Sequence, residues 1–312
     1  MMRTVFMGTP DFAVPCLRQL ADMTQVVGVY TQPDRRQGRG LTLAPPPVKQ
    51  VAMELGLPVH QPARLRSPES WRQLQELEPD LIVVVAYAQI LPVKVLTLPR
   101  YGCINVHASL LPAYRGGAPI HWAILNGETE TGITIMMMDQ GLDTGDILLQ
   151  AALSIGPNET CGEVHDRLAT LGAEALAKAL VALEQGKLES KPQPQVGMSY
   201  ARNLAKQDGL INWASSATTI HNQIRGLNPW PVAYTEHDGK RLRVLRSRLV
   251  DANGQSISAE PGTIIEISEA GPLIQTGDGV LLLSEVQPAS KRRMNGADYV
   301  RGHALTLGSR LG

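Results

Sequence analysis

Two short stretches of the chain hold side chains of the kinds that carry out acid–base chemistry. The first runs from Asn105 to Pro112, where a hydrophobic segment ends on polar residues and enters a loop. The second, Gly141 to Asp146, is a glycine-containing loop with two carboxylates. Open α/β sheets keep their functional residues on such loops. An amide, an imidazole and an acid predict a general acid–base site that uses no covalent nucleophile.

Asn105 and His107 are two positions apart on what reads as an extended strand. Residues i and i+2 of a strand project to the same face, so their amide and imidazole are expected to converge on one cleft. Both groups can hydrogen-bond an oxygen that gains negative charge, which is what stabilises a tetrahedral intermediate. A lone histidine is usually structural, and Asn105 is what changes this interpretation. Asp143 then either orients His107 or relays a proton through water.

Other interpretations of nearby residues are weaker. Ser109 lacks the Gly-x-Ser-x-Gly surroundings of a nucleophile, so we expect it to contact a ligand or to be structural. Asp139, Asp143 and Asp146 do not have calcium-loop spacing, so we expect no metal, with Asp146 capping the loop and Asp139 in a turn. Gly8-Thr9-Pro10 lacks a dinucleotide fingerprint and indicates a tight turn, which disfavours an NAD-dependent oxidoreductase.

The elements that position these residues alternate along the first half of the chain. Leu81 to Ala86 is apolar throughout, as expected for a strand covered on both faces. Ser67-Pro68-Glu69 has the cap, the first-turn proline and the acid that start a helix. The alternation predicts an α/β fold with a doubly wound, mostly parallel sheet. Its other strands are expected at Arg3–Met7, Val26–Tyr30, Leu57–His60 and Cys103–Val106.

The second half of the chain has a different pattern of apolar, polar and glycine residues. Cys161 to Leu183 has a helical apolar stripe, ended by Gly186, and Lys187 to Lys206 then loses periodicity. Beyond Gln207, short β-like runs separated by glycine turns predict a small antiparallel β-barrel, with a helix near Ala217 to Arg225. The expected organisation is a catalytic domain over 1–189, a linker over 190–206 and a C-terminal domain over 207–312.

Composition restricts the class of protein. Of 312 residues, Lys+Arg and Asp+Glu both number 29, so any contact to nucleic acid must come from local basic patches. The three cysteines include no Cys-x-x-Cys, which suits a reducing compartment. No apolar run approaches a membrane span, and the N-terminus lacks the apolar core of a signal peptide. We expect a cytoplasmic protein with no membrane contact, and nothing demands more than a monomer.

Two regions concentrate positive charge. Asp34 to Gly40 is glycine-containing and cationic, and such a segment is either a solvated loop or an arm that reaches a phosphate backbone. A second group includes Arg243, Arg246 and Arg248. These three cannot share one face of a single regular strand, so the second group is only a weak electrostatic indication of nucleic-acid binding.

The motifs resemble those of the methionyl-tRNA formyltransferases over nearly the whole chain. The Asn, His-x-Ser-Leu-Leu-Pro and Asp set is shared by folate-dependent formyltransferases in general and is specific to the reaction type. The arginine-rich loop and the second domain carry the tRNA assignment. The resembling stretches are Gly8–Ala13, Thr31–Arg35, Gly102–His107, Ser109–Pro112, Arg115–Pro119, Gly141–Asp146 and Asn228–Pro231.

The resemblance implies a Rossmann-like formyltransferase domain and a C-terminal domain like an oligonucleotide-binding (OB) barrel. The implied reaction moves a formyl group from 10-formyltetrahydrofolate to the α-amine of methionyl-initiator tRNA, without a metal. One departure is that Leu41-Thr42-Leu43 stands where relatives often have lysines. The implied roles are catalysis for Asn105, His107 and Asp143, folate contact for Ser109, Leu110, Leu111 and Pro112, and tRNA contact for Arg36 and Arg39.

Three alternatives stay open at this stage. A formyltransferase acting on a small amine shares the catalytic set but needs no basic loop. A folate-dependent hydrolase shares the fold, with water as the acceptor of the formyl group. A non-catalytic RNA-binding module needs the basic loop and the barrel but not the catalytic residues.

Overall fold

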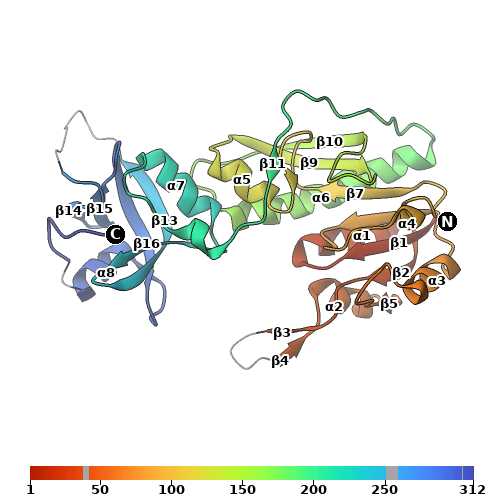
Figure 1. Ribbon diagram of the computed structural model, residues 1–312, viewed down its shortest axis with the longest axis horizontal. Coiled ribbons are helices and arrows are strands. Elements are labelled where there is room, and N and C mark those ends of the chain that lie inside the picture. The colour runs from red at the N-terminus through yellow and green to blue at the C-terminus, as the bar shows by residue number, and fades with distance from the viewer. Residues whose placement is uncertain (38–41, 251–258, 304) are drawn as a thin grey trace. The chain divides into compact units, whose positions relative to one another are not determined.

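The computed structural model describes residues 1–37, 42–250, 259–303 and 305–312 (Figure 1). The chain forms two compact units, each assembled from separate segments. The first unit comprises Met1–Gly116, Thr131–Leu153 and His165–Ala201. The second comprises Gly117–Glu130, Ser154–Val164 and Arg202–Gly312. Most of the expected linker, residues 190–201, therefore belongs to the first unit.

A seven-stranded sheet organises the first unit, in the order β10-β9-β7-β6-β1-β2-β5. The pairs β1–β2, β1–β6, β6–β7 and β2–β5 are parallel, and β7–β9 is antiparallel. The predicted mostly parallel sheet is confirmed. The strands are β1 Arg3–Gly8, β2 Gln25–Tyr30, β5 Val59–His60, β6 Leu81–Val85, β7 Cys103–His107, β9 Glu130–Met137 and β10 Ile147–Ser154.

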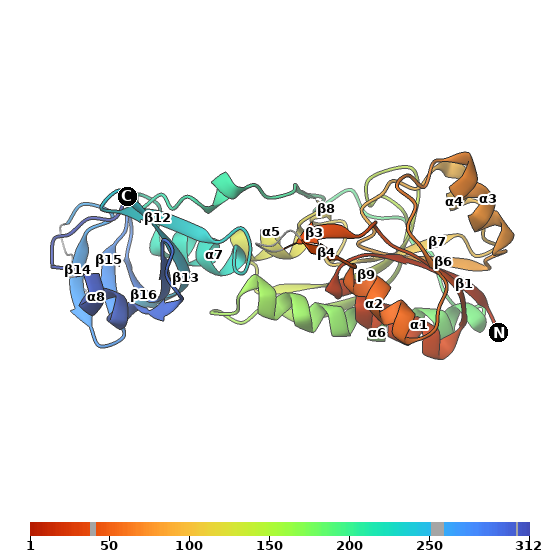
Figure 2. The ribbon, with the colours of Figure 1, turned by 90° about the horizontal axis from the view of Figure 1, so that it is seen from below.

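Helices cover both faces of this sheet (Figure 2). On one face, Gly172 of α6 approaches Cys16 of α1 and Val106 of β7. On the other, Leu74 of α3 and Val95 of α4 pack into a core with residues of β1 and β6. The helices are η1 Asp11–Ala13, α1 Val14–Met23, α2 Pro47–Glu54, α3 Pro68–Glu76, α4 Val93–Leu96 and α6 Cys161–Glu184.

Helix starts follow local capping chemistry. The Ser67 side chain accepts a hydrogen bond from the Ser70 N–H at the start of α3, as the sequence predicts. At the start of α6, Thr160 Oγ1 accepts from the Glu163 N–H and Glu163 Oε2 accepts from the Thr160 N–H. This reciprocal arrangement is a capping box, which satisfies backbone donors that a helix start leaves unpaired.

Two small strand pairs complete the first unit. β3 Arg35–Gln37 and β4 Thr42–Ala44 form an antiparallel hairpin at the basic segment. β8 Arg115–Gly116 pairs in parallel with β11 Tyr200–Ala201. The second pair brings the end of the expected linker back to the loop that follows β7.

The second unit is built on an antiparallel sheet in the order β12-β13-β16-β15-β14, with β17 paired to β16. This confirms the predicted C-terminal β domain, and the helix expected at 217–225 is α7. The elements are α5 Pro119–Leu125, η2 Lys206–Gly209, α7 Ala217–Gly226, β12 Ala233–His237, β13 Lys240–Val250, β14 Ile264–Ser268, β15 Gly271–Gln275, β16 Val280–Pro288, β17 Met294–Asn295 and α8 Gly296–His303.

Strand β13 corrects one sequence inference. Its register is irregular between Val244 and Arg246, and Val244 and Leu245 are both buried. Side-chain alternation therefore slips by one residue, as at a β-bulge. Arg246 and Arg248 are exposed, like Arg241 and Arg243 before the irregularity. The expectation that Arg243, Arg246 and Arg248 cannot share a face assumed a regular strand, and it was wrong for that reason.

Candidate active site

The carboxyl end of β7 carries the two residues that the sequence singled out. Val106 packs against Gly172 of α6, so Asn105 and His107, on either side of it, project to the opposite face of the sheet. His107 is buried, with 6% of its surface exposed, and Asn105 is partly exposed. Within the described part of the chain, the Asn105 amide has no hydrogen-bond partner. Its donor is therefore free for a ligand.

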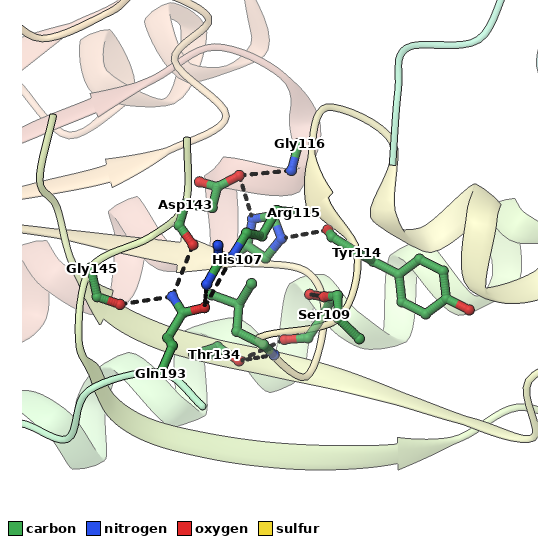
Figure 3. Close-up of polar contacts among 11 residues, drawn as sticks. His107, Ser109, Tyr114, Arg115, Gly116, Thr134, Asp143, Gly145 and Gln193 are labelled. Carbon is green, nitrogen blue, oxygen red and sulfur yellow. Dashed lines mark hydrogen bonds and ion pairs between the residues drawn. The ribbon is translucent and has the colours of Figure 1, made fainter. Parts of the chain in front are cut away.

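One of the two ring nitrogens of His107 is hydrogen-bonded within the protein (Figure 3). Its Nε2 lies 3.0 Å from the carbonyl oxygen of Tyr114. A carbonyl only accepts, so Nε2 must carry the hydrogen. Its Nδ1 lies 3.7 Å from Asp143 Oδ2, which is too long for a hydrogen bond but within ion-pair range. The structure thus brings together two of the three predicted catalytic residues through Nδ1.

Asp143 lies in the loop between β9 and β10, with a backbone φ of 52°. Its Oδ2 accepts a hydrogen bond of 2.8 Å from the Gly116 N–H. The carboxylate is 16% exposed, so one donor fixes its direction while solvent or a ligand can still reach it. An acid placed this way can accept and return a proton.

The turn that holds Asp143 is organised by a different acid from the one expected. The Asp139 carboxylate accepts from Thr144 Oγ1 at 2.7 and 2.8 Å and from the Gly141 N–H at 3.0 Å. Asp146 instead accepts from Ser190 Oγ at 2.7 Å. The loop-capping role expected for Asp146 therefore belongs to Asp139. Sequence spacing could not decide this because both acids flank the same turn.

Two further residues at the site were not expected from the sequence. Gln193 Nε2 donates to the carbonyl oxygens of Asp143 and Gly145, at 2.8 and 2.7 Å. Gln193 Oε1 accepts from Arg115 Nε and Nη2, at 3.1 and 2.6 Å. Gln193 lies between two prolines, a pattern that predicts extended backbone but no partner.

In the loop after β7, some of the predicted folate-contact residues are buried and others are partly exposed. Ser109 is fully buried, and its Oγ donates to the Ala113 carbonyl at 2.6 Å. Leu111 is 3% exposed, and its N–H donates to Thr134 Oγ1 at 3.1 Å. Leu110 and Pro112 are partly exposed. We therefore expect Ser109 and Leu111 to shape this loop, which leaves ligand contact to the other two.

The basic segment is held at its base by a partly exposed carboxylate, that of Asp34. Asp34 accepts from Gln61 at 2.7 Å and from Lys49 at 2.9 and 2.8 Å, and these two donors hold the pKa of its carboxyl below the usual range. Arg36, in β3, is exposed. Arg39, the other predicted tRNA contact, lies outside the described residues.

Over residues 1–37, 42–250, 259–303 and 305–312, no group of three or more His, Cys, Asp or Glu side chains could hold a metal ion. In the same ranges, no helix is both long enough and apolar enough to cross a bilayer.

Family models cover most of the chain. One, described as formyl transferase, matches residues 2–180, and another, described as formyl transferase, C-terminal domain, matches residues 203–304. The chain belongs to the formyl transferase family.

Its relatives match it from end to end. A protein of Geobacter sulfurreducens named methionyl-tRNA formyltransferase is 48% identical over 312 residues, covering 100% of this chain and 97% of the relative. A protein of Desulforamulus reducens with the same name is 49% identical, covering 100% of this chain and 98% of the relative. The expected resemblance to the methionyl-tRNA formyltransferases is thus confirmed.

Solved structures share the fold at lower identity. An N-formyltransferase from Helicobacter canadensis, in complex with folinic acid and dTDP-3-aminofucose, aligns with a TM-score of 0.68 and 20% identity, over 92% of this chain and 100% of that chain. HypX from Aquifex aeolicus, in complex with tetrahydrofolic acid, aligns with a TM-score of 0.62 and 16% identity, over 96% of this chain and 47% of that chain. At these identities the comparison supports the fold alone.

Proposed function

We propose that the chain transfers a formyl group from 10-formyltetrahydrofolate to the α-amine of methionyl-initiator tRNA, which prepares that tRNA for translation initiation. The observation that carries the proposal is the 48% identity, over the whole chain, to a protein named for this reaction. The site geometry supports the chemistry, because an unpaired amide, an imidazole and a carboxylate gather at the end of β7 and its neighbouring loop.

Formyl transfer exchanges one C–N bond for another. The free amine attacks the formyl carbon, and the carbonyl oxygen gains negative charge. Asn105 is placed to donate to that oxygen, since its amide has no competing partner in the described chain. His107 can stabilise this negative charge only through Nδ1, because its Nε2 donates to the Tyr114 carbonyl.

The attacking amine must lose a proton and the departing folate nitrogen must gain one. Asp143 accepts the first proton and returns it, with His107 Nδ1 sharing the charge across their 3.7 Å contact. No atom of the chain is acylated in this scheme.

Direct transfer fits the state of the candidate nucleophiles. The Ser109 hydroxyl is fully buried and donates to Ala113. All three cysteines of the chain are buried, and burial raises the pKa of each thiol to about 12. A buried, protonated thiol is a poor nucleophile. A covalent formyl-enzyme therefore has no prepared attacking group among these residues.

The two substrates would use different surfaces. Leu110 and Pro112, beside the catalytic strand, offer partly apolar contact for the folate donor, with Ser109 and Leu111 shaping the loop. Arg36 and Arg39 offer charge for the tRNA, and the exposed arginines of β13 offer more. We propose that the protein acts as a cytoplasmic monomer.

A formylation assay tests this function. The purified chain would be offered initiator and elongator methionyl-tRNA in parallel, each with and without 10-formyltetrahydrofolate. The proposal predicts formyl-methionine on the initiator only, and only with the donor. Release of free formate without formylated tRNA would indicate a hydrolase, and transfer only to an amino sugar would indicate a small-amine formyltransferase. Either result would contradict the proposal.

A further inference from the structure

Residues 190–201 form a strap that is bound along the first unit. Ser190 donates to Asp146 at 2.7 Å. Lys191 and Ile147 exchange backbone hydrogen bonds of 2.8 and 2.9 Å. At its far end, β11 pairs with β8. The strap is therefore fixed on both sides of the position where Gln193 reaches the active-site loop.

The Gln193 amide can take only one orientation in this network. Arg115 has donors and no acceptor, so it requires the amide oxygen of Gln193 to face it. The carbonyls of Asp143 and Gly145 are acceptors, so they require the amide nitrogen. Arg115 is 8% exposed, and the hydrogen bonds that Gln193 makes on both sides are partly buried. Gln193 thus connects a buried guanidinium to the backbone on both sides of residue 144.

That backbone is held in an unfavourable conformation. Asp143 has a φ of 52°, in the left-handed region that non-glycine residues rarely occupy. Such a conformation persists only where surrounding contacts hold it. Gly145 passes close to the Met137 carbonyl oxygen, where a Cβ would lie 1.9 Å away, so this position of the turn requires glycine. Among the residues that the structure describes, Gln193 is the side chain that donates hydrogen bonds to the carbonyls of this turn.

The same strap also reaches the other partner of His107. The Tyr114 N–H donates to Ser199 Oγ at 2.9 Å, and the Tyr114 carbonyl accepts from His107. Figure 3 shows the contacts that join Gln193 to the Asp143 carbonyl and His107 to the Asp143 carboxylate. Each of the two groups that face the imidazole nitrogens therefore belongs to a residue that the strap holds.

We propose that Gln193 is a positioning residue that keeps the Asp143 carboxylate directed toward His107, with Arg115 fixing the orientation of its amide. This inference rests on the proposed catalytic role of Asp143. Losing the two amide bonds lets the turn relax toward an ordinary φ and moves the carboxylate. A displacement of about 1 Å in a reacting group costs on the order of a hundredfold in rate.

The test compares kcat and KM of Gln193→Ala, Gln193→Glu and Gln195→Ala. Gln195 is the matched control: it has the same side chain two positions along the strap, it is exposed, and it has no side-chain hydrogen bond within the described chain. Gln193→Glu still accepts from Arg115 but cannot donate to the two carbonyls, and its charge repels them. It therefore separates the donor role from simple pairing with Arg115.

We expect both Gln193 variants to lower kcat by about ten- to a hundredfold, with KM for both substrates within about twofold of wild type. Gln195→Ala should match wild type. In an Asp143→Asn background, Gln193→Ala should lower kcat no further, because the group it positions is already lost. The melting temperatures of all variants, measured against Gln195→Ala, should show that they are folded.

Three results would overturn the inference: unchanged kcat in Gln193→Glu, a loss confined to KM, or a full further loss when Gln193→Ala is added to Asp143→Asn. Failure of the proposed catalytic role looks different. In that case Asp143→Asn alone would retain the activity of wild type, whatever the Gln193 variants do.

Discussion

The imidazole of His107 faces the carboxylate of Asp143 with its free nitrogen, Nδ1 to Oδ2 at 3.7 Å, while its Nε2 donates to Tyr114. When Nε2 carries the ring hydrogen, Nδ1 presents a lone pair to the carboxylate. A proton taken up between Nδ1 and Oδ2 gives both atoms a hydrogen-bond partner. The pair is therefore suited to hold a proton briefly during formyl transfer. Asn105 is left as the group free to bind the carbonyl oxygen.

Removing the Asn105 amide should slow turnover with little effect on binding. Loss of one oxyanion donor costs about 2.7–4 kcal/mol of barrier, so kcat of Asn105→Ala should fall by about a hundredfold or more. Steady-state formylation of methionyl-initiator tRNA measures this. Turnover close to wild type would remove Asn105 from the catalytic assignment.

Replacing His107 should abolish the proton-sharing contact with Asp143. General acid–base groups typically contribute about 10²–10⁴ in rate, and we expect His107→Asn to lose kcat within that range. His165→Asn is the control, since His165 lies in the same unit and contacts Asp166 and Asp11 instead. Equal losses in both variants would point to general damage of the first unit.

Removing charge from the basic segment should change KM for methionyl-tRNA and leave KM for the folate donor unchanged. We expect Arg36→Ala to raise KM for methionyl-tRNA and to reduce the salt dependence of that KM by roughly one phosphate contact. KM for 10-formyltetrahydrofolate should stay unchanged. Arg18→Ala is the matched control, because Arg18 is exposed in α1 and paired with Glu54 at 2.8 Å. Unchanged tRNA kinetics and salt dependence in Arg36→Ala would argue against this role.

Stability of the second unit should fall in mild acid because of His221. Burial is the main cause that lowers its pKa, the Pro157 carbonyl opposes the shift, and the Arg225 charge adds to it. The unfolded state therefore binds the proton first, at about pH 6.5. The contribution of His221 to the free energy of unfolding is complete above that pH and is lost as the pH falls toward the lowered pKa.

Thermal melting between about pH 8 and 5.5 measures this effect, because the window includes the unfolded-state pKa of histidine. The melting temperature of His221→Gln should depend on pH less steeply than that of wild type. Identical slopes in wild type and His221→Gln would contradict the prediction.

Local sequence patterns predicted individual strands and helices. The features that depend on pairing between residues far apart in the sequence could not be predicted from those patterns. The apolar run of β6 and the Ser67 cap of α3 depend on neighbouring residues, so the sequence located both. The common face of Asn105 and His107 follows from the strand period alone. The contact of Gln193 with the Asp143 loop joins residues 50 positions apart, and no local pattern encodes it. The slip in β13 depends on its pairing with β16, which the sequence alone does not show.

A crystal structure of the chain with a folate analogue whose formyl group cannot be transferred tests the central claim most directly. The account predicts the formyl oxygen at about 3 Å from Asn105 Nδ2, with the formyl carbon on the side of His107 Nδ1 and Asp143. A folate bound elsewhere on the chain, or one whose formyl oxygen makes no contact with Asn105, would contradict it.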